Sequence, residues 1–342
     1  MIKGEAQRRN EKAKRKPQWF STAVAVATNN ATSIECNPFP TKLREAMEPH
    51  ICKSRQRRED ALQILRNTNP AIFDKIFSRF QENDISTEGE FPFDTFKYPL
   101  RESLLEAFAL KNTFDLSKMH EDPQTKNKAF HSLTNQPKIR IRFHETFDNF
   151  VRKVCAPHLA SLHNKSSQSS CTEIYYQAFP CIRIVQPYDF SIGPHADVMY
   201  GHHPCAVNYY LPLTSIGGTS ALFLESAPNK EDWHPIVGNY GSCVKHFAGG
   251  MNLHYTVENW TGQTRVSLDF RLIEGSMFES LDCKESQFVK KNGYYSKCVL
   301  TKDKNITEEK DTWERSGDLL SPDGRVGFPW TVKDWNKILK TR

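Results

Sequence analysis

Two histidines and one aspartate in the second half of the chain are spaced so that they could bind one metal ion. His195 and Asp197 are separated by a single residue, in a stretch that follows Pro194. On an extended segment such residues project to the same side, so this imidazole and this carboxylate can reach the same ion. His254 lies in another short segment with a strand-like composition. Together the three would form a facial set of ligands that leaves up to three positions of an octahedral ion open.

An arginine and a serine follow His254 on a segment that we predict to be a strand, Arg265 to Ile273. Arg265 and Ser267 share one face of it, while the apolar residues between and beyond them occupy the other. A guanidinium directed into a β-barrel is costly unless it meets an anion. The anion could be a bound carboxylate, paired bidentately with the arginine and hydrogen-bonded by the serine hydroxyl. A structural ion pair with Asp269 is the alternative.

Other histidines compete for the metal. A second His-x-Asp motif, His120-Glu121-Asp122, lies in a charged stretch without a strand pattern, which predicts a solvated loop. His202 and His203 fall in a turn flanked by glycine and proline. His246 stands nineteen residues before Arg265, whereas His254 stands eleven residues before it. We therefore expect none of these histidines to be a ligand.

The elements that must position these residues fall into three zones. Amphipathic stripes predict helices over about residues 42–165, including a helix from His144 to Leu162, with a polar loop from Ser117 to Lys128. From about 171 to 275 the pattern changes to short runs of β-branched and aromatic residues separated by proline, glycine or asparagine. The C-terminal extension, 276–342, is polar and mixed. Helices followed by strands, without β-α-β alternation, indicate an α+β fold with an antiparallel β core.

Seven short runs make up the predicted core strands: Ile174–Ala178, Cys181–Gln186, Ala206–Leu211, Ala221–Leu224, Ser242–Phe247, Met251–Val257 and Arg265–Ile273.

Composition and charge restrict the class of protein. The 342 residues are 38% hydrophobic, which is typical of a globular chain. Of the net charge of +6, residues 1–16 carry +5. This predicts a basic disordered tail over residues 1–20 and a nearly neutral single domain over 21–342. A near-neutral body without a nucleic-acid-binding motif favours a small-molecule substrate over nucleic acid.

Localisation follows from what the sequence lacks. No apolar run approaches the roughly 20 residues of a bilayer span, and no secretion signal precedes the domain. The nine cysteines are odd in number and include no Cys-x-x-Cys pair. We therefore expect reduced thiols in an intracellular, cytoplasmic protein.

The stretch from about Ile182 to Ile273 resembles the Fe(II)/2-oxoglutarate-dependent dioxygenases, in the branch found among natural-product biosynthetic hydroxylases. The resemblance rests on a His-x-Asp motif, a distal histidine and an Arg-x-Ser motif on the next strand. The matching motifs are Pro194–Asp197, Tyr200–His202, Asn208–Thr214, Leu224–Ser226, Asn259–Gly262 and Thr264–Ser267. The helical zone and the C-terminal extension carry no motif of that family.

The resemblance implies a double-stranded β-helix, or jelly roll, with the helical N-terminal portion packed on it. It implies that His195, Asp197 and His254 bind iron and that O2 is a co-reactant. It also implies that Arg265 and Ser267 bind 2-oxoglutarate. Asn208 could add a hydrogen bond to this cosubstrate or have a structural role. Tyr200 and His202 are candidates for substrate contact. Arg183 and Arg271 could meet a substrate carboxylate or form structural pairs.

The expected reaction is hydroxylation or oxidative cyclisation of an amino-acid-derived or other natural-product intermediate, as in kainoid synthases, with release of succinate and CO2. Three alternatives stay open. The same ligands could hold zinc for a hydrolase. The chain could be a non-enzymatic binding module on a jelly-roll scaffold. It could also hydroxylate a protein or nucleic acid, with the basic tail as a docking arm. Succinate formation that depends on 2-oxoglutarate would distinguish the oxygenase from the zinc hydrolase, and the complete set of metal ligands argues against the binding module.

Overall fold

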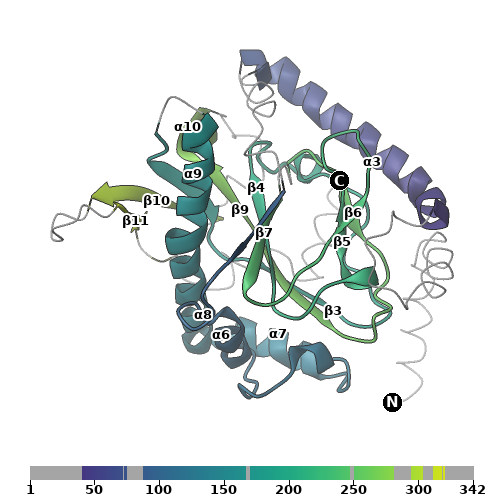
Figure 1. Cartoon of the computed structure of the whole chain (residues 1–342), viewed down its shortest axis with the longest axis vertical. Helices are drawn as coiled ribbons and strands as arrows, with labels where there is room; N and C mark the ends of the chain where they lie inside the picture. Colours follow the sequence, from purple (N-terminus) through teal and green to yellow (C-terminus); the bar gives the residue numbers. More distant parts are fainter. Residues whose placement is uncertain are drawn as a thin grey trace.

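Figure 1 shows the computed structural model, which describes residues 41–71, 73–74, 88–166, 170–246, 250–280, 294–302, 311–317 and 319. The predicted basic tail lies outside these residues, as does most of the C-terminal extension. Among the described residues, no helix has both the length and the apolar character that crossing a bilayer would require.

A large antiparallel sheet forms one half of the β core. Its strands follow the spatial order β1, β7, β4, β9, β2, β10, β11, and β3 also pairs with β9. Their bounds are β1 Gly89–Pro92, β2 Glu173–Gln177, β3 Cys181–Val185, β4 Val207–Pro212, β7 Ser242–His246, β9 Arg265–Glu274, β10 Tyr295–Lys302 and β11 Asp311–Ser316.

Strand β9 is the central element of this sheet. It pairs with β4 on one side and with β2 and β3 on the other. Its side chains alternate between two buried faces, as the sequence predicts. Val266, Leu268 and Phe270 enter the main hydrophobic core, while Arg265 and Ser267 project to the opposite face.

A small antiparallel sheet forms the other half. It consists of β6 (His234–Ile236), β5 (Leu222–Leu224) and β8 (His254–Thr256), in that order. The two sheets pack on each other through a buried cluster in which Tyr210 of β4 meets Leu222 and Leu224 of β5. The predicted α+β class with an antiparallel β core is confirmed.

Helices cover the outer face of the large sheet. They are α6 (Leu100–Ala107), α7 (Thr125–Asn135), α8 (Pro137–Phe150) and α9 (Ala156–Ser166), and a π-helical turn joins α8 to α9 (Figure 1). The rings of Phe147 and Phe270 lie 5.0 Å apart, edge to face, across this helix–sheet interface. The short helix α10 (Gly275–Ser280) follows β9.

Helix α3 (Thr41–Thr68) lies on the opposite side, beside the small sheet (Figure 1). It ends where the sequence predicts a break, before Pro70.

Two expectations about elements were wrong, and the C-terminal extension holds two strands that the sequence did not predict. The predicted loop Ser117–Lys128 contains a short 3-10 turn and the first residues of α7. Strand β1 lies within the zone predicted to be helical. The described part of the C-terminal extension supplies β10 and β11, which widen the large sheet.

Candidate metal site

The two sheet segments that carry His195 and His254 lie against each other. The two residues form an antiparallel bridge through reciprocal backbone hydrogen bonds of 3.1 and 2.9 Å. Asp197 starts the 3-10 turn Asp197–Tyr200 directly afterwards. The potential ligand atoms of the three buried residues all lie within 4.8 Å of one another. In the part of the chain that the structure describes, this is the one such cluster of histidine, cysteine or acidic side chains.

Backbone carbonyls orient both imidazoles. Nδ1 of His195 lies 2.9 Å from the carbonyl oxygen of Gly193, and Nδ1 of His254 lies 3.0 Å from that of Asn252. A carbonyl only accepts, so each Nδ1 donates, and each Nε2 keeps its lone pair. These Nε2 atoms lie 3.6 and 3.7 Å from Oδ1 of Asp197. Both rings are therefore prepared to bind a cation beside that oxygen.

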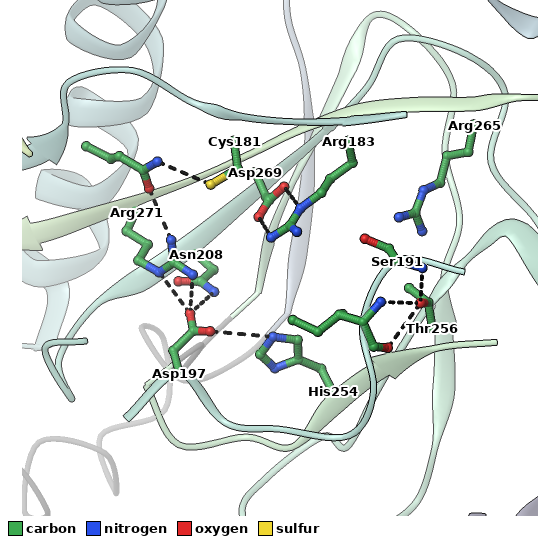
Figure 2. Close-up of polar contacts among 12 residues, drawn as sticks. Cys181, Arg183, Ser191, Asp197, Asn208, His254, Thr256, Arg265, Asp269 and Arg271 are labelled. Atoms are coloured by element: carbon green, nitrogen blue, oxygen red, sulfur yellow. Dashed lines mark hydrogen bonds and ion pairs between the residues drawn. The ribbon is translucent and has the colours of Figure 1, made fainter. Parts of the chain in front are cut away.

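The second oxygen of Asp197 is already engaged. Oδ2 accepts from Nε and Nη2 of Arg271, at 2.8 and 2.6 Å, and from Nδ2 of Asn208 at 3.0 Å (Figure 2). Burial acts to raise the pKa of Asp197, but Arg271 and the surrounding histidines outweigh it and hold that pKa well below its usual range. The carboxylate is thus ionised, and Oδ1 is the oxygen that faces the imidazoles.

This contact bears on two of the predicted roles. The amide nitrogen of Asn208 donates to Asp197. The predicted hydrogen bond from Asn208 to a cosubstrate stays a prediction. Arg271 extends from β9 and is also held by Gln177 and Tyr294, at 3.1 and 3.3 Å. Its two-residue periodicity with Arg265 and Ser267 was the signal that could have assigned it to the site.

Arg265 lies on the same face of β9, further toward the start of the strand. It is 3% exposed and donates from Nη1 to the carbonyl oxygen of Ser220 at 2.9 Å, while its Nε has no hydrogen-bond partner. The structural pair with Asp269 does not form, because Asp269 is bound by two nitrogens of Arg183, each at 3.0 Å (Figure 2). No carboxylate of the described residues pairs with Arg265.

Two more buried polar atoms near Arg265, the hydroxyl oxygens of Ser267 and Tyr210, have no partner other than each other. Burial raises the pKa of Tyr210, while Arg265 and Ser267 act in the opposite direction, which places the three groups in one electrostatic neighbourhood. Tyr210 lies within the motif Asn208–Thr214, but the sequence assigned it no role, because its place beside Arg265 depends on how β4 pairs with β9. Orphaned donors beside an unpaired guanidinium are the arrangement that a carboxylate completes.

Of the predicted substrate-contact residues, Tyr200 and His202 lie near the His-Asp-His cluster. The ring of Tyr200 lies 5.4 Å from that of His195. His202 is half-buried beside Asp197, and desolvation together with the charge of Arg271 lowers its pKa to about 3. Arg183 has its guanidinium engaged as described above.

In the second His-x-Asp motif Glu121 and Asp122 are exposed, as predicted, and His120 alone is partly covered. His120 is half-buried, and its Nδ1 lies 3.0 Å from the hydroxyl of Thr264, the residue before Arg265. The side chain of His246 lies outside the described residues.

Comparison with known proteins gives one sequence relative. The chain is 30% identical over 148 residues to the streptomycin biosynthesis protein StrG of Streptomyces griseus, and the alignment covers 43% of this chain and 68% of StrG. No protein-family model matches the chain.

Similar solved structures include the non-heme monooxygenase ThoJ in complex with nickel, with 10% identity, a TM-score of 0.33, and coverage of 76% of this chain and 95% of that one. Another is the non-heme alpha ketoglutarate dependent epimerase SnoN from nogalamycin biosynthesis, with 13% identity, a TM-score of 0.33, and coverage of 73% and 98%. Both TM-scores lie below 0.5.

Proposed function

The chain belongs to the family of the streptomycin biosynthesis protein StrG, and from this premise we propose that it is a non-haem oxygenase that uses Fe(II) and 2-oxoglutarate. Its substrate is a small molecule of a biosynthetic pathway, oxidised by hydroxylation or cyclisation. The observation that carries the proposal is the pairing of a buried His-Asp-His cluster with an arginine that lacks a counter-ion.

The donor set supports a divalent metal. His195 and His254 turn their Nε2 atoms toward Oδ1 of Asp197, and both Nδ1 protons are tied to backbone carbonyls. Two imidazole nitrogens and one carboxylate oxygen suit Fe(II) and leave the remaining positions open. Because Arg271 and Asn208 occupy Oδ2, Asp197 would bind through one oxygen and add no further ligand.

The unpartnered polar groups on the large sheet support a dicarboxylate cosubstrate. Arg265, Ser267 and Tyr210 would receive its distal carboxylate, with the guanidinium as the charge partner and the two hydroxyls as donors. The bound carboxylate would supply hydrogen-bond acceptors to all three buried groups, and an unsatisfied buried polar group is costly in free energy.

Fe(II) with bound 2-oxoglutarate would supply the chemistry that uses O2 to oxidise an unactivated C–H bond, with release of succinate and CO2. The protein's own residues position the reactants and exclude water. The carbonyls of Gly193 and Asn252 fix the imidazoles, Arg271 keeps Asp197 ionised, and Arg265 sets the direction of the cosubstrate. No side chain needs to act as a general base.

A zinc hydrolase on the same three ligands is the competing function. Zinc accepts such a set with a water in the fourth position. That function would leave Arg265, Ser267 and Tyr210 without a ligand, so the site favours the oxygenase.

Anaerobic calorimetry provides the test. Fe(II) should bind the apo-protein, and 2-oxoglutarate should then bind the iron-loaded protein. Arg265→Ala should lose the second event and keep the first. A panel of amino-acid-derived and aminoglycoside-type intermediates is then screened in air for succinate release coupled to substrate. Tight Zn(II) binding without any 2-oxoglutarate binding would overturn the proposal.

A further inference from the structure

One face of helix α3 is directed at the two segments that carry the histidines. Met47, Ile51, Ser54 and Arg58 recur at helical spacing and are 0, 0, 6 and 0% exposed. Met47 and Ile51 join a buried cluster with residues adjacent to the candidate ligands, Ala196 and Leu253 among them. The two polar members of this face lie one turn apart and each reaches a different ligand segment.

Ser54 contacts the first segment. Its hydroxyl donates to the carbonyl oxygen of Pro194 at 2.6 Å. Pro194 stands between Gly193, whose carbonyl orients the imidazole of His195, and His195 itself. The hydrogen bond therefore fixes the peptide that joins a candidate ligand to its orienting carbonyl.

Arg58 contacts the second segment directly and through Glu225. Its Nη1 donates to Oε1 of Glu225 at 2.6 Å and to the carbonyl oxygen of Met251 at 3.1 Å. Both charged side chains are fully buried. The same Oε1 accepts the backbone N–H of Leu253 at 2.7 Å.

Glu225 also holds the residue that orients His254. The side-chain amide of Asn252 donates to the backbone carbonyl of Glu225 at 2.9 Å, and the backbone carbonyl of Asn252 receives Nδ1 of His254. Three consecutive residues before His254 are thus tied to the pair formed by Arg58 and Glu225.

We propose that α3 is a clamp that sets the geometry of the metal site, with Ser54 and Arg58 as its positioning residues. The inference rests on the proposed function of the His-Asp-His cluster. A helix that only covered apolar surface would need no buried charge, and a buried ion pair is a poor source of stability. Mutation of a residue that orients a metal ligand typically lowers metal affinity by about 10- to 100-fold.

Co(II) titration of the full chain, followed by its visible d–d absorption, tests the clamp. Arg58→Met should raise the Co(II) dissociation constant by about tenfold or more. Arg58→Lys should recover part of this, since it keeps the charge but not the fork. Ser54→Ala, which removes one hydroxyl, should raise the constant by about three- to tenfold. Arg66→Met is the matched control, because Arg66 is exposed on the same helix, and it should bind Co(II) like the unmodified chain.

Thermal unfolding of the apo-proteins is measured alongside. If Ser54→Ala and Arg58→Lys bind Co(II) as tightly as the unmodified chain and only their melting temperatures fall, α3 is a structural cover and the inference is wrong. These two variants decide the matter even if Arg58→Met does not fold. Failure of the unmodified chain to bind Co(II) would instead contradict the metal site itself, so the two failures are distinguishable.

Discussion

Arg265 is the residue on which the cosubstrate assignment depends most. Replacing it with alanine should raise the apparent KM for 2-oxoglutarate by about two orders of magnitude, because the buried carboxylate loses its charge partner. Arg265→Lys should recover only part of the loss. Tyr210→Phe and Ser267→Ala should each cost about tenfold, since each removes one hydroxyl. Succinate production against 2-oxoglutarate concentration gives the measurement.

Metal affinity serves as the control for these variants. Arg265 is not a ligand, so Fe(II) should bind Arg265→Ala as it binds the unmodified chain. An unchanged KM in Arg265→Ala would show that the carboxylate is held elsewhere.

Arg271 should determine the pH range over which the metal binds. Its charge opposes the effect of burial on Asp197, so the pKa of Asp197 should rise in Arg271→Met. Protons then compete with the metal at higher pH, and the midpoint of Co(II) binding should shift upward by about one pH unit or more. Asn208→Ala removes only a neutral donor and should shift it less. Co(II) absorbance followed from pH 5 to 8 measures both. Equal midpoints for all three proteins would refute the role of Arg271.

For single residues of the site, the sequence predicts those that share a strand face with a neighbour two positions away. The two-residue spacing places His195 with Asp197 and Arg265 with Ser267. Tyr210 could not be found in this way, because its place depends on the register between β4 and β9. Arg58 and Glu225 are 167 residues apart, and no local pattern connects them. The ligand roles themselves stay predictions.

Among the elements, the seven core strands were predictable because their buried residues alternate or run together between turn-forming residues. Strand β1 is four residues long and ends in proline, so it carries too little pattern to stand out from the surrounding helices. The sequence of β10 shows no regular alternation of polar and apolar residues, and the strand is identified only by its pairing with β2 and β11.

Strand β11 should contribute to stability without affecting the metal site. Trp313 is 4% exposed and belongs to the main core beneath the helices. Trp313→Ala should lower the free energy of unfolding by about 3–5 kcal/mol, measured by urea denaturation of the apo-protein. Glu314→Gln changes an exposed neighbour that pairs with Arg152 and Lys153, and should cost less than about 1 kcal/mol. Equal losses in both variants would show that β11 is peripheral to the core.

For the whole molecule, buried neutral histidines predict loss of stability in acid. Burial lowers the pKa of His203 to about 4, against about 6.5 in an unfolded chain. As the pH falls from about 6.5 to 4, the unfolded chain takes up a proton that the folded chain does not. The free energy of unfolding should therefore fall by up to about 1.4 kcal/mol per pH unit for this residue.

His203→Asn keeps an acceptor for the backbone N–H of Cys205, which His203 accepts through Nδ1, but cannot titrate. Its stability should depend less steeply on pH over the same interval, as measured by urea denaturation at half-unit steps. A slope identical to that of the unmodified chain would mean that other groups govern the acid transition.

The division into a tail and a single domain over 21–342 remains a prediction.

The candidate ligands come from the small sheet and the segment bridged to it, whereas Arg265, Ser267 and Tyr210 come from the large sheet. The separation of the two sheets would therefore select the length of a dicarboxylate that binds the metal at one end and Arg265 at the other. A dicarboxylate one carbon shorter, oxaloacetate, or one carbon longer, 2-oxoadipate, should compete poorly with 2-oxoglutarate, although each carries the same reactive end. Cosubstrate choice would then depend on how the two sheets pack. Substitutions of Leu222 or Leu224, in the buried cluster between the sheets, would change that choice without altering a residue that contacts either end of the dicarboxylate.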